Sequence, residues 1–149
     1  MTDSELMQLS EQVGLALKAR GATMTTAESC TGGWVAKAIT DIAGSSAWFE
    51  RGFVTYSNEA KAQMIGVREE TLAQHGAVSE PVVVEMAIGA LKAARAHFAV
   101  SISGIAGPPA SWPPSPPPRA AIASRCWSGK PVWAASCSPP ATAAATSPT

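Results

Sequence analysis

One short turn constrains this chain most, because it joins a strand-like segment to a helix-like one. Residues 22–27 are rich in β-branched side chains, which favours a buried β-strand. Residues 34–39 have the composition of a helix, and Gly32 and Gly33 stand just ahead of them. Such a turn is typical of α/β proteins, and it brings backbone N–H groups and the positive end of a helix close to a ligand. Ser29 lies at this junction.

The rest of the first 107 residues alternates between helical and strand patterns. Thr2 and Glu5 are spaced as a capping box for a helix that ends at Gly21. The apolar face expected of this helix consists of Leu6, Leu9, Val13 and Leu17. Further strands are expected at 48–55 and 98–103, and further helices at 58–65, capped by Asn58, at 69–74, and after the Ser79 cap. This order predicts an α/β three-layer sandwich with a mixed or parallel sheet.

The composition changes abruptly near Pro108. All 11 acidic residues lie at or before Glu85, and 11 of the 12 prolines lie at or after Pro108. Residues 1–107 carry 8 basic and 11 acidic residues, a net charge of −3, and the remainder carries only Arg119, Arg125 and Lys130. We therefore divide the chain into a domain at 1–108 and a Pro/Ala/Ser-rich tail at 109–149.

Two explanations of the tail are open, a proline-rich docking arm and a shifted reading frame, and the second is favoured. Proline lacks an N–H donor and fixes φ, so residues 113–118 fit neither a helix nor an inner strand. We expect 109–149 to be disordered or out of frame, with little regular structure and no strand paired with 98–103. Its tryptophans, Trp112, Trp127 and Trp133, would then be exposed.

Charge and cysteine content exclude several classes of protein. Basic and acidic residues balance at 11 each, which gives no general attraction to nucleic acid. The chain has no apolar run long enough to cross a membrane, and its acidic start is not a signal peptide. Three cysteines without paired spacing argue against disulfides and against a metal site. We expect a cytoplasmic protein without cofactor, and a homo-oligomer is compatible with the sequence.

Two glycine turns follow strand-like segments, Ser29–Gly33 and Ser103–Gly107. If the strands are parallel neighbours, both turns line one crevice, which would suit a phosphate-bearing ligand. The glycines could equally serve only the tight packing of helix against strand. The spacing alone favours neither the ligand-binding nor the packing interpretation.

Ser29 is the candidate nucleophile, and it needs a base to take its proton. Lys61 is a better candidate for this base than His75 or His97. A cation in the first turn of a helix meets the positive helix end, and burial would disfavour its charge further. Tyr56 lies near Lys61 in the sequence and could relay a proton or donate to an oxyanion. The plainer alternatives are a solvent-facing lysine and a core tyrosine with a hydrated hydroxyl.

Other groups are weaker candidates. Cys30 competes with Ser29 as nucleophile, and Glu28 fits a structural acid better than a catalyst. His75 and His97 have no paired acid and are expected to be structural.

Four blocks in order resemble the CinA C-terminal domain family, the nicotinamide-nucleotide amidohydrolases. They are Thr26–Gly33, Val54–Asn58 with Lys61, Gly76–Ser79 and Ser103–Pro108. The resemblance covers residues 5–108 and implies a three-layer α/β amidase that converts nicotinamide mononucleotide to nicotinate mononucleotide and ammonia. It implies Ser29 as nucleophile with Lys61 and Tyr56 as partners. The substrate-binding residues expected with them are Cys30, Thr31, Gly32, Gly33, Gly104 and Gly107.

The resemblance stops at Pro108. The family continues with a glycine-rich acidic loop, two strands and a helix, and Pro109–Pro113 has no such character. We therefore expect a sheet that is incomplete in its C-terminal half and an impaired activity. The alternative function is a catalytically inactive nucleotide-binding module.

Overall fold

A computed structural model of the chain describes residues 1–105, 120–126 and 131–137. Its helices are α1 (Asp3–Ala19), α2 (Trp34–Thr40), α3 (Asn58–Ile65), α4 (Glu69–His75) and α5 (Glu80–Ala94), with a 3-10 turn at Ser45–Ala47. Its strands are β1 (Met24–Glu28), β2 (Phe49–Val54), β3 (Phe98–Ser103), β4 (Ala120–Cys126) and β5 (Pro131–Cys137).

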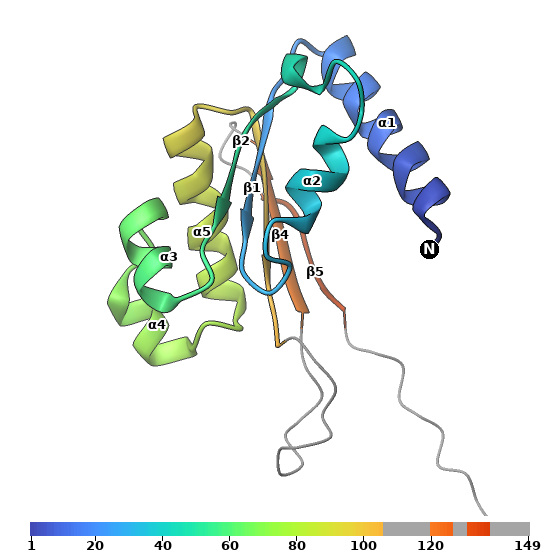
Figure 1. Cartoon of the computed structure of the whole chain (residues 1–149). Coiled ribbons are helices and arrows are strands. Elements are labelled where there is room, and N and C mark those ends of the chain that lie inside the picture. The colour runs from blue at the N-terminus through green and yellow to red at the C-terminus, as the bar shows by residue number, and fades with distance from the viewer. Residues whose placement is uncertain (106–119, 127–130, 138–149) are drawn as a thin grey trace, which may run out of the picture.

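The strands form one mixed sheet in the order β2-β1-β3-β4-β5. β1 runs parallel to both β2 and β3, whereas β4 and β5 are antiparallel to their neighbours. Helices α1 and α2 lie on one side of the sheet, and α3, α4 and α5 lie on the other (Figure 1). The predicted three-layer α/β sandwich with a mixed sheet is confirmed.

The register of the parallel strands brings their carboxyl ends to one edge of the sheet. Glu28 at the end of β1 is paired with Val54 of β2 and with Ile102 of β3. The turns after β1 and β3 therefore leave the sheet side by side, as the sequence predicted for parallel neighbours.

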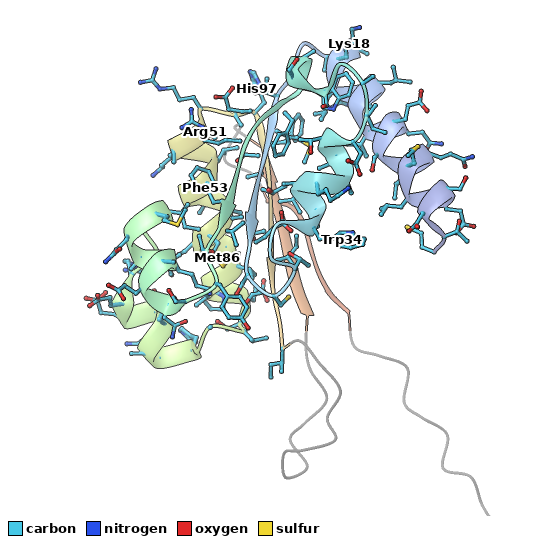
Figure 2. The ribbon with its side chains drawn as sticks, viewed as in Figure 1. Lys18, Trp34, Arg51, Phe53, Met86 and His97 are labelled. Carbon is cyan, nitrogen blue, oxygen red and sulfur yellow. The ribbon has the colours of Figure 1, made fainter. Side chains whose placement is uncertain are left out.

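Helix α5 carries the larger core. Val82, Val83, Met86 and Ala90 are buried and pack with Ala27 of β1 and with Phe53 of β2. Phe53 and Met86 lie on facing elements in this layer (Figure 2). Pro81 lies in the first turn of α5, where its missing N–H costs no helical bond.

The apolar face predicted for α1 is partly wrong. Leu17 is buried, but Leu9 is 46% exposed and Val13 is 37% exposed. The helix instead presents Gly14 to the indole ring of Trp48, which is too close to leave room for a Cβ atom. Only the C-terminal half of α1 therefore meets the core, and its N-terminal end lies away from the sheet (Figure 1).

The expectation that nothing after Pro108 pairs with the sheet is wrong. β4 pairs antiparallel with the whole of β3, from Phe98 with Cys126 to Ser103 with Ala121. The segment 120–126 contains no proline, so it can complete the ladder along the open edge of β3. Pro131 begins β5, the edge strand, where a missing N–H is tolerated. The sheet therefore has two more strands than the sequence predicts. The tail tryptophans, which are expected to be exposed, have their side chains outside the described part of the structure.

Candidate active site

Ser29 is fixed at the first residue beyond β1. Its backbone N–H donates to the carbonyl of Ile102 at 2.9 Å, so the neighbouring strand β3 holds the turn in place. The side chain is 7% exposed. The turn then bends through Gly32 and Gly33, whose φ angles of 61° and 99° are in the region that favours glycine.

The side chain of Lys61, on helix α3, contacts Ser29 at the end of β1. Helix α3 is capped by Ser57, whose hydroxyl accepts from Ala60 N–H at 3.0 Å; the predicted cap, Asn58, is instead the first helical residue. Lys61 lies in the first turn of this helix and is 1% exposed. Its Nζ atom lies 3.1 Å from Ser29 Oγ.

Two backbone carbonyls hold the lysine amine. Lys61 Nζ donates to Thr55 O at 2.8 Å and to Tyr56 O at 3.3 Å. Both acceptors are uncharged, and no ion pair involves Lys61 among the described residues. Burial lowers the pKa of Lys61 below its usual 10.5, and the nearby Cys30 opposes this in part.

A neutral amine fits these contacts in full. It has two N–H donors and one lone pair, and the two carbonyls accept both donors. The lone pair is then left for the hydroxyl proton of Ser29, 3.1 Å away. This is the geometry of a nucleophile with its general base.

Glu28 has a structural role, as the sequence indicated. It is 1% exposed and its carboxylate accepts from Thr31 Oγ1 at 2.7 Å, from Val35 N–H at 2.9 Å and from Ala36 N–H at 3.0 Å. The first turn of α2 therefore donates to the protein's own carboxylate. This corrects the expectation that the N–H groups of this helix face the ligand.

Donors for a developing negative charge remain in the turn itself. Within residues 1–105, the backbone N–H groups of Cys30, Thr31 and Gly33 have no acceptor. They lie in the same turn as Ser29, which is the position that an oxyanion site requires.

The other predicted residues are placed less closely. Tyr56 contacts Lys61 through its carbonyl, and its side chain is 73% exposed. Cys30 is partly buried beside the pair, and Gly104 follows β3 at the same sheet edge. Gly107 lies outside the described residues. His97 accepts from Thr23 N–H at 3.0 Å, far along the chain from Ser29, in line with its structural assignment.

A hollow of about 250 Å³ lies elsewhere, between α1 and α2, and is lined by Leu6, Met7 and Trp34 among others. The exposed Trp34 is labelled in Figure 2. Neither Ser29 nor Lys61 lines this hollow, so it is separate from the candidate site. Among the described residues, no helix is long and apolar enough to cross a membrane. The same residues contain no cluster of His, Cys, Asp and Glu that could hold a metal ion.

A family model for the CinA C-terminal domain matches residues 6–136. The chain belongs to this family. Among its relatives is the nicotinamide-nucleotide amidohydrolase PncC of Escherichia coli K12, 95% identical over 108 residues, which are 72% of this chain and 66% of the relative. The PncC of Enterobacter agglomerans is 67% identical over the same number of residues, with the same coverage of both chains. The chain thus matches slightly less than two thirds of these relatives' length.

A solved structure of the CinA family agrees with the fold. The competence/damage inducible protein CihA from Agrobacterium tumefaciens has a TM-score of 0.83 and 41% identity, covering 91% of this chain and 81% of that one. The CinA match also extends beyond Pro108 into β5.

Sequence reasoning missed one residue of this CinA site, Thr55. Its carbonyl holds Lys61, and its backbone N–H donates to the carbonyl of Glu28 at 2.7 Å. A signal was present, because Thr55 directly follows β2 and the ends of parallel strands converge.

Proposed function

We propose that this chain is an amidase that hydrolyses the carboxamide of nicotinamide mononucleotide to give nicotinate mononucleotide and ammonia. The observation that carries the proposal is the buried contact of 3.1 Å between Lys61 Nζ and Ser29 Oγ. The names of the amidohydrolase relatives support the choice of substrate.

In the first half of the reaction, Ser29 Oγ forms a bond to the carboxamide carbon while Lys61 takes the hydroxyl proton. The carbonyl oxygen becomes an oxyanion, for which the backbone N–H groups of Cys30, Thr31 and Gly33, which have no acceptor within residues 1–105, are the proposed donors. One such donor is worth roughly 3–4 kcal/mol in well-studied enzymes. Lys61 then gives the proton to the leaving nitrogen, the C–N bond breaks and ammonia departs.

In the second half, water attacks the acyl group on Ser29 and gives its proton to Lys61. The ester bond breaks, the acid is released and the proton returns to Ser29 Oγ. The neutral state of Lys61 is needed at both attacks, and its burial favours that state.

Tyr56 has two parts in this proposal. Its carbonyl orients the lysine amine. Its exposed hydroxyl, which has no hydrogen-bond partner among the described residues, is available as a donor to bound substrate. Cys30, Thr31, Gly32, Gly33, Gly104 and Gly107 are proposed to line the substrate site around this pair.

The partner in this proposal is a small nucleotide, with no nucleic acid, membrane or cofactor involved. A cytoplasmic location and a homo-oligomeric state belong to the same proposal. The balance of 11 basic and 11 acidic residues supports the exclusion of nucleic acid.

The test is release of ammonia from nicotinamide mononucleotide by the purified chain and by Ser29→Ala. We expect release by the first and none above background by the second. Equal release by both would remove Ser29 from the mechanism. Binding of the nucleotide in calorimetry without any release would favour the alternative, an inactive nucleotide-binding module.

We also propose that residues 1–108 carry the amidase residues and that 109–149 are read out of frame, although β4 and β5 of this segment extend the sheet. The loss of every acidic residue after Glu85 and the run of prolines after Pro108 support this. Sequencing the coding DNA around the Pro108 codon tests it. A second frame that encodes an acidic, glycine-rich loop is the expected result, and its absence would refute the proposal.

A further inference from the structure

Glu28 makes hydrogen bonds to several segments around the candidate active site. It is the last residue of β1 and directly precedes Ser29. Its carboxylate is buried and accepts four hydrogen bonds, from Thr26 Oγ1 at 3.3 Å and from Thr31 Oγ1, Val35 N–H and Ala36 N–H at 2.7–3.0 Å. These donors come from β1, from the turn and from α2.

The backbone of Glu28 reaches the other half of the catalytic pair. Its carbonyl accepts the N–H of Thr55 at 2.7 Å, and the carbonyl of Thr55 in turn accepts from Lys61 Nζ at 2.8 Å. One residue therefore connects the nucleophile, through the peptide bond, with the acceptor that orients the base.

We propose that Glu28 is a positioning residue, which holds Ser29 and the turn N–H groups in register with Lys61 by satisfying the donors of the turn and of α2. The inference rests on the proposed function, because it needs Ser29 to be the nucleophile. Glu28 touches neither the Ser29 hydroxyl nor the Lys61 amine, so it acts only through the groups it holds.

A neutral amide cannot replace the carboxylate. Each carboxylate oxygen accepts a backbone N–H, Oε1 from Val35 and Oε2 from Ala36, so in Glu28→Gln the side-chain NH₂ would face one of these two donors. Residues 29–33 would then relax away from Lys61. A displacement of about 1 Å at a reacting group can cost about 100-fold in rate.

The experiment measures the reactivity of Ser29 itself in the full chain. An alkyl fluorophosphonate forms an Oγ–P bond with the serine while fluoride leaves and Lys61 takes the proton. Its rate of attachment is followed by intact mass, and Ser29→Ala identifies the labelled site. We expect Glu28→Gln to lower this rate by about 100-fold and Glu28→Asp, which keeps the charge but is one methylene shorter, to fall between it and the unsubstituted chain.

The matched control is Glu85→Gln. Glu85 is also largely buried, with 20% of its side chain exposed, but it pairs with Arg68 at 3.0 Å on the α5 side of the sheet. It undergoes the same chemical change without contact to the Ser29 turn, so its labelling rate is expected to stay within about twofold. In the ammonia assay, Glu28→Gln should lower kcat with KM nearly unchanged.

The possible results test two claims separately: that Ser29 is the nucleophile and that Glu28 positions it. No label on Ser29 of the unsubstituted chain overturns the nucleophile, and with it this inference. Normal labelling of folded Glu28→Gln overturns the inference alone. If Glu28→Gln does not fold, Thr26→Val decides, because it removes one donor to the carboxylate in an isosteric change. It is expected to slow labelling about threefold, and an unchanged rate would refute the role of Glu28.

Discussion

The buried amine of Lys61 should make the stability of this protein depend on alkaline pH. The folded state lowers the pKa of Lys61 below 10.5 because the side chain is 1% exposed. Between that lowered pKa and 10.5, the unfolded chain binds a proton at this lysine and the folded chain does not. The unfolded state then binds more protons, so the free energy of unfolding rises as the pH rises through this window.

The size of this pH dependence follows from the titration of one group, the Lys61 amine. The difference in unfolding free energy between the unsubstituted chain and Lys61→Met should change by at most about 1.4 kcal/mol per pH unit. The variant also leaves the buried carbonyl of Thr55 without this donor, a cost of about 1–3 kcal/mol, but this cost does not depend on pH. Only the slope therefore reports the titration of Lys61.

The assay is urea unfolding at a series of pH values from neutrality to 10.5, with free energies from linear extrapolation. Lys37→Met is the control, since that lysine side chain is 68% exposed and pairs with Asp41 at 2.7 Å. The control should follow the unsubstituted chain in parallel, whereas Lys61→Met should not. A difference that stays flat with pH for Lys61→Met would show that the amine keeps its ordinary pKa, and would refute its role as a base near neutral pH.

Three further substitutions test other features. Met86→Ala should lower the free energy of unfolding by about 2–5 kcal/mol in the same urea assay, because Met86 is fully buried in the α5 core; a loss under 1 kcal/mol would contradict that packing. Gly89→Ala should destabilise by about 3 kcal/mol or more, since its Cβ would overlap the carbonyl oxygen of Ile65, and unchanged stability would show that α3 and α5 lie further apart. Tyr56→Phe keeps the carbonyl that holds Lys61 but removes the exposed hydroxyl, so kcat for ammonia release should fall at least about tenfold at unchanged stability; full activity would confine Tyr56 to its backbone role.

The parallel part of the sheet could be predicted from the sequence because its signals are local. The strand at 98–103 was predicted with the bounds that the structure gives, and Thr2 and Glu5 form the expected capping box. The Ser29 turn was recognisable because a β-branched run, two glycines and a helical segment follow one another within 20 residues.

The state of Lys61 could not be predicted in the same way. Its position in the first turn of α3 was visible, but its burial depends on carbonyls at the end of β2 that only the folded sheet brings to it. The cap of α3 was misplaced by one residue, because Ser57 and Asn58 are both good caps and only the backbone geometry distinguishes them.

The remaining differences arise from contacts distant in the sequence. The spacing of Leu6, Leu9, Val13 and Leu17 predicts the face of α1, whereas the structure turns Gly14 towards Trp48, 34 residues away. The prolines around β4 and β5 predict irregular structure, whereas the 12 residues between Pro118 and Pro131 include the seven-residue strand β4, which pairs with β3.

The place of β1 between two parallel partners has a consequence for the motions of the site. Its five residues are all buried, and it is hydrogen-bonded on both sides. Amide protons in such a strand exchange with solvent only when much of the domain opens, so the opening free energy at 25–28 should approach that of global unfolding. Ser29 is covalently attached to this slowly exchanging strand and bonded to β3. The nucleophile should therefore belong to the least fluctuating part of the chain, and the motions that admit a substrate must come from the segments around it.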